Sequence, residues 1–400
     1  MLLGSLPFLA LGGGGALGWQ RLARPAAPDE PLSEAARALV AEAWKGLDPA
    51  RVVDVHVHVV GIGTGDSGCW VNPRMRSFWH PLEYARFDIY RRAAGIRDLD
   101  AADAQYIERL SELARASDPR GRLMLLAFDR VHREDGSMDE GASEFYVPND
   151  HVLAEVERAP DLFLACGSIH PYRKDAVAEL ERIVERGARA IKWLPSAMRI
   201  DPGSTLCDAF YAKAAELGVP ILTHGGEERA VEVAEAQELS NPLRLRRALD
   251  AGVKVIVAHC ASSGEGIDLD SPGNPRRPNF ELFLRLIEDG KYRDRLWGEI
   301  SATTQYNRCD VLPTLLSRSE LHPRLVNGSD YPLPAINVLT RTGALLDRAL
   351  ITEVERELLN ELDRHNPLLF DFVMKRSLRG PGGERFADRV FMPQGLLRTS

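Results

Sequence analysis

The sequence predicts an α/β fold: a (β/α)8 barrel, or TIM barrel, with a long insertion after its first strand and a helical C-terminal extension. Three observations predict it. Short apolar runs rich in β-branched residues recur eight times along the 400-residue chain. Several intervals between these runs have apolar residues at helical spacing. Polar residues able to bind a metal ion stand at the ends of several runs, which is where such barrels hold their active sites.

The eight apolar runs are typical of short strands buried on both faces. They are residues 52–60, 122–129, 162–170, 190–195, 219–226, 253–260, 296–304 and 324–332. Strands that alternate with helices imply parallel strands joined by right-handed crossovers, and eight of them favour a closed barrel over an open doubly wound sheet. No G-x-G-x-x-G sequence follows the first run, which weighs against a dinucleotide-binding fold.

Helical spacing is clearest in residues 176–188, where Val177, Leu180, Ile183 and Val184 form one apolar stripe. Comparable patterns occupy residues 207–218, 241–252 and 278–290, and each ends in a glycine. Glycine just beyond the last apolar position is typical of a helix C-terminus. These segments are therefore expected to be helices between barrel strands.

The chain is expected to have four parts. Residues 1–27 form an apolar segment compatible with a signal peptide or membrane anchor, residues 28–50 a helical lead-in, residues 51–380 the barrel, and residues 381–400 a C-terminal tail. The apolar segment has no basic residue before it and contains six glycines, both of which weaken the reading as a signal or anchor. We expect a cytoplasmic protein, with export or membrane anchoring through this segment as the alternative.

The composition of the chain argues against some classes of binding partner. A net charge of −8 and a pI near 5.8 argue against nucleic acid or an anionic membrane surface as the main partner. A small-molecule substrate fits better, and a homo-oligomer remains open. The cysteines form no C-x-x-C pair and predict core thiols in a reducing compartment rather than disulfides or a zinc ribbon; they are Cys69, Cys166, Cys207, Cys260 and Cys309.

Residues 61–121 separate the first two strands by far more than a usual barrel loop. The segment contains helical stretches and the aromatic or imidazole side chains of Trp70, Phe78, Trp79, His80 and Tyr84. A long segment after a barrel strand lies at the catalytic end of the barrel, where it can cover a pocket and exclude water. A plain structural insertion is the alternative.

Six polar residues stand at or near the predicted strand ends. They are His56, His58, Lys192, His224, His259 and Asp330. Imidazole and carboxylate groups are good ligands for divalent metal ions, and His56 and His58, two residues apart on one strand, can both reach one ion. The set predicts a divalent metal cofactor, zinc in the first place, with manganese or iron as alternatives and with one or two ions. Asp330 can also accept a proton from water, which makes it a candidate catalytic residue.

Lys192 has two readings. Its amine, converted by carbon dioxide to a carbamate, could bridge two metal ions, or the unmodified lysine could hold a substrate carboxylate. Each of the six residues taken alone has an ordinary structural explanation, because a single histidine in a strand is usually packed and Asp330 could cap a turn. Six costly polar groups at or near the ends of five strands are difficult to explain in that way.

The segments DVHVH, AIKWLP, LTHGG, VAHC, NGSDYP and NPLLFDFVMK, in this order over about residues 52–380, resemble the amidohydrolase superfamily, in particular the amidohydrolase-related (family 2) branch. The resemblance implies a metal-bearing barrel with His56, His58, His224 and Asp330 as ligands. It implies that His259 assists catalysis in one-metal relatives or binds a second ion in two-metal relatives, where a strand-four lysine is the carboxylated bridge. The long loop after residue 260 differs from that of many relatives, so the resemblance does not indicate which substrate this protein binds. Glu299 could support the ligands, and Trp193 and Tyr331 could line the pocket or simply pack.

Three functions follow from this reading. The leading one is a metal-dependent hydrolase that uses activated water on the C–N or C–O bond of an amide, lactone or ester, with Asp330 and His259 as catalytic residues. The second is a metal-dependent non-oxidative decarboxylase, which would need Arg74, Arg76 or Arg199 to bind the carboxylate. The third is a barrel that binds a metal or ligand without turnover.

Overall fold

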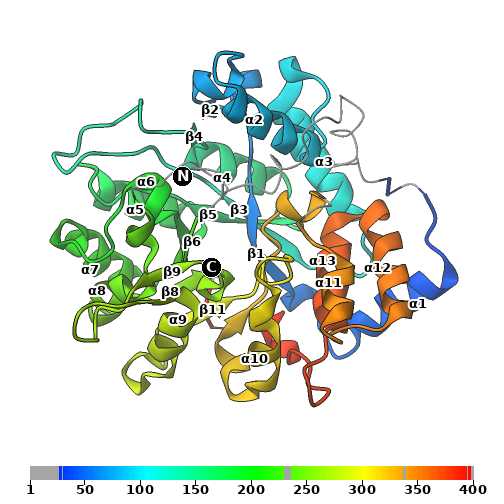
Figure 1. Cartoon of the computed structure of the whole chain (residues 1–400). Helices are drawn as coiled ribbons and strands as arrows, with labels where there is room; N and C mark the ends of the chain where they lie inside the picture. The colour runs from blue at the N-terminus through cyan, green and yellow to red at the C-terminus, as the bar shows by residue number, and fades with distance from the viewer. Residues whose placement is uncertain (1–26, 29, 229–235, 337–338, 394, 398–400) are drawn as a thin grey trace.

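The computed structural model describes residues 27–28, 30–228, 236–336, 339–393 and 395–397. Eight parallel strands form one sheet in the order β1-β3-β5-β6-β7-β8-β11-β12, with helices around it (Figure 1). Each predicted apolar run overlaps one of these strands, so the predicted (β/α)8 fold is confirmed. The barrel strands are β1 (Val53–His58), β3 (Arg122–Leu126), β5 (Phe163–Gly167), β6 (Ala188–Trp193), β7 (Ile221–His224), β8 (Val255–Ala258), β11 (Leu296–Glu299) and β12 (Leu325–Val326).

The sheet closes between its last and first strands. β12 has only two residues, but the chain that follows it continues alongside β1. The N–H of Val55 donates to the carbonyl of Asn327 (3.0 Å), and the N–H of Asp330 donates to that of His56 (2.7 Å). The N–H of His58 donates to the carbonyl of Tyr331 (2.9 Å). These bonds carry the closing segment past the end of β12 and bring Asp330 beside the histidines of β1.

The side chains of β1 do not alternate regularly between the inside and the outside of the barrel. Its pairing with β3 shifts register between Asp54 and Val57, which indicates a β-bulge. Val53 and Val55 pack inside the barrel, whereas Val57 packs in the outer core with the surrounding helices. From the bulge onward the side chains of His56 and His58 face the cavity at the catalytic end of the barrel. The simple alternation expected from the sequence is therefore interrupted where the histidines begin.

The barrel interior is a small apolar core, separate from the larger core between strands and helices. It is lined by Val53, Val55, Met124, Leu126, Leu164, Cys166, Ala190, Leu222, Ile256, Ala258, Val326 and Leu396. Leu396 belongs to the predicted C-terminal tail. Val390 and Phe391 of that segment are also buried, and their carbonyls accept hydrogen bonds from Asn327 and Val53. The described part of the tail therefore packs against the amino end of the barrel.

The helices surround the sheet and carry most of the outer core. They are α1 (Glu34–Trp44), α2 (Pro81–Ala93), α3 (Ala102–Arg115), α4 (Asn149–Arg158), α5 (Ala176–Glu185), α6 (Pro195–Met198), α7 (Asp208–Leu217), α8 (Arg246–Asp250), α9 (Asn279–Glu288), α10 (Leu312–Ser317), α11 (Thr342–Asp347), α12 (Glu353–His365) and α13 (Pro367–Ser377). The predicted helices at 176–188, 207–218 and 278–290 correspond to α5, α7 and α9. The prediction at 241–252 is only half right, because a 3-10 helix, Pro242–Leu245, precedes the short α8.

The insertion after β1 contains α2, α3 and the short strand β2 (Trp70–Val71). β2 pairs antiparallel with β4 (Phe145–Tyr146), which belongs to a second excursion between β3 and α4 that the sequence reading did not identify. Figure 1 shows α2 and β2 together at the top of the molecule. A further two-stranded ribbon, β9 (Glu265–Ile267) with β10 (Arg276–Pro278), lies in the long loop after β8.

All five cysteines are buried and unpaired, as expected. Within the described residues, no helix combines the length and the apolar character needed to cross a bilayer. The predicted N-terminal segment 1–27 lies, except for Ala27, outside the described residues.

A buried lysine fixes the segment that leads to Asp330. Lys375, on α13, donates to the Asp371 carboxylate (2.6 Å) and to the carbonyl of Gly328. A Cβ at Gly328 would meet Glu299 Oε1 and the Cβ of His56, each at 2.6 Å, so only glycine allows this close approach. α13 therefore holds the backbone two residues before Asp330 from outside the barrel.

The substitution Lys375→Met is expected to lower the free energy of unfolding by about 3–5 kcal/mol, because it leaves the Asp371 carboxylate buried without its cation. Urea denaturation followed by circular dichroism measures the change. The double variant Lys375→Met/Asp371→Leu should lower the free energy of unfolding by less than the sum of the decreases caused by the two single substitutions. A loss below about 1 kcal/mol in Lys375→Met would contradict the role given to this pair.

His170, in the loop after β5, is fully buried, and its imidazole is hydrogen-bonded in the neutral form. Its Nε2–H donates to the carbonyl of Met198 (2.9 Å), and its Nδ1 accepts from the N–H of Tyr172 (3.2 Å). Burial lowers the pKa of His170 to about 3. Between this value and the unfolded pKa of about 6.5 the unfolded chain binds the extra proton, so this residue makes stability fall as the pH falls.

We therefore expect wild-type protein to lose up to about 2 kcal/mol more stability than His170→Gln between about pH 8 and about pH 5. Glutamine can keep a donor and an acceptor at this position but does not titrate. Urea denaturation of both proteins at the two pH values, in the presence of a chelator, gives the difference directly. Equal losses in the two proteins would show that His170 is not held neutral.

Candidate metal centre

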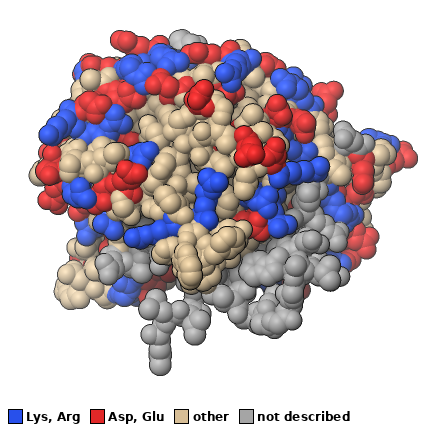
Figure 2. Space-filling model, turned by 90° about the horizontal axis from the view of Figure 1, so that it is seen from above, with Lys and Arg blue, Asp and Glu red and all other residues tan. Residues whose placement is uncertain are grey.

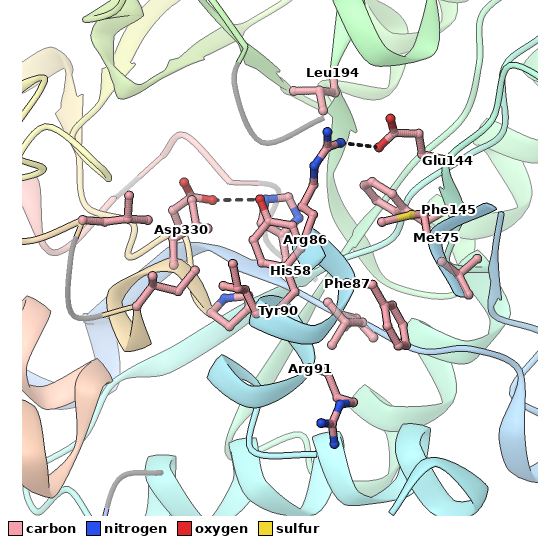
Figure 3. A pocket seen from close by; sticks show the side chains of 18 of the residues that line it. His58, Met75, Arg86, Phe87, Tyr90, Arg91, Glu144, Phe145, Leu194 and Asp330 are labelled. Carbon is pink, nitrogen blue, oxygen red and sulfur yellow. Dashed lines mark ion pairs between the residues drawn. The ribbon is translucent and has the colours of Figure 1, made fainter. Parts of the chain in front are cut away.

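The six predicted residues meet at one cavity. His56, His58, Lys192, His224, His259 and Asp330 all line a cavity of about 280 Å³ at the carboxyl ends of the strands. Five of them are almost fully buried, and the His58 side chain is 24% exposed. Figure 3 shows the ion pair of His58 and Asp330 inside this cavity.

His56 is held at both ring nitrogens. Its Nδ1–H donates to Glu299 Oε2 (3.0 Å), which leaves a lone pair on Nε2. The Nε2 atom lies 3.2 Å from His58 Nε2 and 3.4 Å from Asp330 Oδ1. Burial, together with the nearby Lys192, lowers the pKa of His56 well below its ordinary value, so the ring is neutral. It therefore turns the Nε2 lone pair toward another imidazole, a carboxylate and the Lys192 amine.

His259 and His224 are oriented in the same way. His259 Nδ1 donates to the carbonyl of Ser301 (3.1 Å), and its Nε2 lies 3.9 Å from Asp330 Oδ2. His224 Nδ1 lies 3.3 Å from Glu228 Oε2, and its buried Nε2 has no hydrogen-bonding partner among the described residues. Burial lowers the pKa of His224 to about 4 and that of His259 well below the ordinary value. Both rings are neutral and keep their Nε2 lone pairs.

The backbone is unusual where two of these side chains leave their strands. His259 has φ 58° and Asp330 has φ 61°, values that residues other than glycine rarely adopt. Such positions cost of order 1–3 kcal/mol each and concentrate at functional sites. At Asp330 the hydrogen bond to the His56 carbonyl holds the conformation.

These residues fit a divalent metal ion. The ligand atoms of His56, His58 and Asp330 lie within 4.8 Å of one another, as do those of His56, His259 and Glu299. Glu299 approaches the Nδ1 atoms of the two rings, at 3.0 and 3.9 Å, so its role is to orient them. The buried, unpaired Nε2 of His224 is a polar group that a metal ion would satisfy. Nitrogen and oxygen donors of this kind suit zinc and neighbouring divalent ions.

Lys192 enters the same cluster from β6. Its Nζ lies 3.0 Å from His56 Nε2, and the side chain is 1% exposed. Burial lowers its pKa, against the opposing effect of the Asp330 and Glu299 carboxylates. The amine is thus placed among the predicted metal ligands, as the sequence indicated.

The insertion covers the cavity with different residues from those predicted. Phe78 and Trp79 are 80% and 91% exposed and point to solvent, and Trp70, His80 and Tyr84 do not line the cavity. The lining from this segment consists chiefly of Met75 and seven residues of α2: Leu82, Ala85, Arg86, Phe87, Ile89, Tyr90 and Arg91. The sequence indicated that aromatic residues were present but not which way they face.

The predicted cations were also wrong. Arg74, Arg76 and Arg199 are exposed and do not line the cavity, whereas Arg86 and Arg308 do. Trp193 and Tyr331 are buried packing residues outside the lining.

Sequence reasoning missed four residues around the cluster: Glu228, Ser301, Tyr90 and Arg308. Glu228 follows His224 by four residues in a loop, and Ser301 follows Glu299 by two, so closeness to a predicted ligand was a usable signal for both. Burial, with the charges of Glu228 and Asp330, raises the pKa of Tyr90, so its phenol keeps its proton. Arg308 is 7% exposed and lowers the pKa values of His224 and His259 through its charge. Nothing in the local sequence singled out these last two.

Several solved structures are similar to this chain at low identity. An uncharacterised TIM-barrel protein from Bordetella bronchiseptica is 17% identical, with a TM-score of 0.48, over 78% of this chain and 97% of that one. A probable 2-pyrone-4,6-dicarboxylic acid hydrolase from Acinetobacter baumannii is 12% identical, with a TM-score of 0.42, over 81% and 99%. A 5-carboxyvanillate decarboxylase from Sphingomonas paucimobilis is 12% identical, with a TM-score of 0.46, over 85% and 98%.

None of the curated proteins compared with this chain matches it. A family model described as Amidohydrolase (amidohydrolase family 2) matches residues 53–368, from the first residue of β1 to the second residue of α13. This match contains all six residues of the cluster and every strand of the barrel. The chain therefore belongs to amidohydrolase family 2.

Proposed function

We propose that this protein is a metal-dependent hydrolase that cleaves the C–N or C–O bond of a small-molecule amide, lactone or ester. The observation that carries the proposal is the orientation of His56, His224 and His259. Each ring has its Nδ1 held by an oxygen acceptor, and their Nε2 atoms are left for other partners, two of them beside Asp330. Oxygen acceptors on one nitrogen fix the tautomer that metal ligands need on the other.

The metal we propose is zinc, with manganese or iron as alternatives, held by His56, His58, His224 and Asp330. Lys192 and His259 lie close enough to this set to take part in holding a second ion. A bound divalent ion would polarise a substrate carbonyl and lower the pKa of a coordinated water toward neutrality.

The chain's own groups divide the remaining tasks. The Asp330 carboxylate, which has oxygens near the imidazoles of His58 and His259, accepts the proton of the attacking water and returns it to the leaving group. The protonated Tyr90 phenol and the Arg308 guanidinium line the cavity and can donate to substrate oxygens. α2 excludes bulk water from these groups.

One observation favours the second function, a metal-dependent decarboxylase. Lys192 and Arg308 are buried cations on the cavity wall, and a substrate carboxylate would suit either. Carbon dioxide released from an aromatic or unsaturated acid, without consumption of water, would support it over hydrolysis. A non-catalytic barrel would bind metal and turn over neither class of compound.

Chelator-treated protein is expected to bind zinc tightly and to melt at a higher temperature once loaded, because a ligand that binds only the folded state stabilises it. Glu299→Gln should weaken zinc binding by about 10–100-fold, since the residue orients His56. Isothermal titration calorimetry measures both affinities. The exposed Glu320→Gln variant is the control and should bind like wild type. Failure of the folded protein to bind zinc, manganese and iron would reject the proposal.

Asp330→Asn is expected to lower kcat by about 10²–10⁴-fold on whichever amide, lactone or ester is turned over, because asparagine cannot accept the proton. The variant keeps an oxygen ligand, so calorimetry should still detect bound metal. The exposed Asp310→Asn variant controls for general effects of removing a charge. Unchanged turnover in Asp330→Asn would contradict its catalytic role.

A further inference from the structure

The cavity has two chemically different sides. Asp330 and His58 lie on one side, and Figure 3 shows Met75, Phe87 and Phe145 grouped on the opposite side. The apolar lining comes from the insertion, from β4 and from the loop after β12. It includes Val71, Met75, Leu82, Phe87, Ile89 and Phe145. A substrate that reaches the metal centre must therefore also contact a wall that favours apolar groups.

Two cations on α2 line the cavity, but each already has a carboxylate partner. Arg86 Nη1 lies 3.5 Å from Glu144 Oε2, as the dashed line in Figure 3 marks. Arg91 Nη2 lies 2.6 Å from Asp88 Oδ1, within the same helix. On this side of the cavity, a second anionic group on the substrate would compete with these carboxylates and lose its hydration. The other lining cations, Lys192 and Arg308, lie beside the histidines of the cluster and not on the apolar side.

The apolar lining continues to the surface at the start of α2. Leu82 lines the cavity and is 53% exposed, and the exposed Phe78 and Trp79 precede it by four and three residues. In the view from above (Figure 2), charged side chains gather around a broad area of residues without formal charge. Leu82 therefore carries the apolar lining of the cavity out to the surface.

We propose that the substrate carries its reactive carbonyl on an apolar alkyl or aryl body without a second charge, and that this body packs against α2. The inference rests on the proposed hydrolase function and names its substrate class. The cavity of about 280 Å³ is nearly twice the ~150 Å³ cavity that accommodates one benzene molecule. It can hold a small polar head at the metal centre together with a body of about one to two aromatic rings.

Straight-chain hydroxamates from acetohydroxamate to octanohydroxamate, which chelate metal through a constant head group, test the proposal on zinc-loaded protein. We expect the dissociation constant, measured by calorimetry, to fall by about fourfold for each added methylene until the cavity is filled. A chain of equal length that ends in a carboxylate should bind at least about tenfold more weakly than its methyl-terminated counterpart. A dissociation constant independent of chain length, or tighter binding of the carboxylate, would overturn the proposal.

Ala85→Phe is designed to fill the apolar side from α2. It should remove the gain with chain length, although acetohydroxamate should still bind to the zinc-loaded protein. Glu83→Phe, two residues away on the same helix and outside the lining, is the matched control and should keep the wild-type dependence. If Ala85→Phe does not fold, Ala85→Leu should shorten the longest chain that still gains affinity. A wild-type dependence in a folded Ala85 variant would place the apolar body elsewhere and overturn the proposal.

Primary amides from acetamide to octanamide, titrated into chelator-treated protein, separate this proposal from the metal chemistry. The same gain per methylene is expected, because the apolar wall does not need the metal. If affinity rises along the amide series but no hydroxamate binds, the metal centre is rejected and the proposed apolar binding wall is supported. Metal-dependent binding of acetohydroxamate with no gain in either series would reject the apolar side alone.

Discussion

The arrangement of the cluster depends on one buried carboxylate, that of Glu299. It accepts hydrogen bonds from His56 Nδ1 at 3.0 Å, from the Ser301 hydroxyl at 2.6 Å and from the Ser301 N–H. A carboxylate with no exposed surface is costly unless it is bonded in this way, and burial raises its pKa to about 7. Because its acceptors are used on the Nδ1 side of His56, the Nε2 side is left to face His58 and Asp330. The close approach of Gly328 then packs the closing segment against the same group.

The geometry also requires backbone that regular strands cannot supply. A bulge in β1 lets Val55 fill the barrel interior and His56 face the cavity, although strict alternation would place neighbours on opposite faces. His259 and Asp330 leave their strands through left-handed conformations. Packing elsewhere must offset the cost of these positions, and the Lys375 bond to Gly328 is one such contact. The cluster therefore depends on α13, which lies outside the barrel and contributes no ligand to it.

The sequence was informative where the physical signal is local. Buried parallel strands form continuous apolar runs in the sequence, so all eight can be recognised. Polar residues such as His56, His224 and Asp330 are conspicuous at or near the ends of these runs. The two-residue length of β12, the bulge in β1 and the packing of Leu396 into the barrel depend on contacts between distant segments, which leave no periodicity to detect. The sequence shows that the insertion contains Phe78 and Trp79, but their orientation toward solvent is decided by which face of the insertion meets the barrel.

The two sides of the cavity differ in how freely their residues could change. On the side of the cluster, His56, His259 and His224 are held by Glu299, Ser301 and Glu228, so a substitution there leaves a buried polar partner unsatisfied. On the opposite side α2 contributes apolar side chains such as Leu82 and Ile89, which can be exchanged for others of similar volume at little cost. Changes in α2 can therefore alter which molecules fit without disturbing the groups that act on them. Physically, the barrel strands limit the chemistry that this site can perform, and the insertion limits the shape of the molecule on which it is performed.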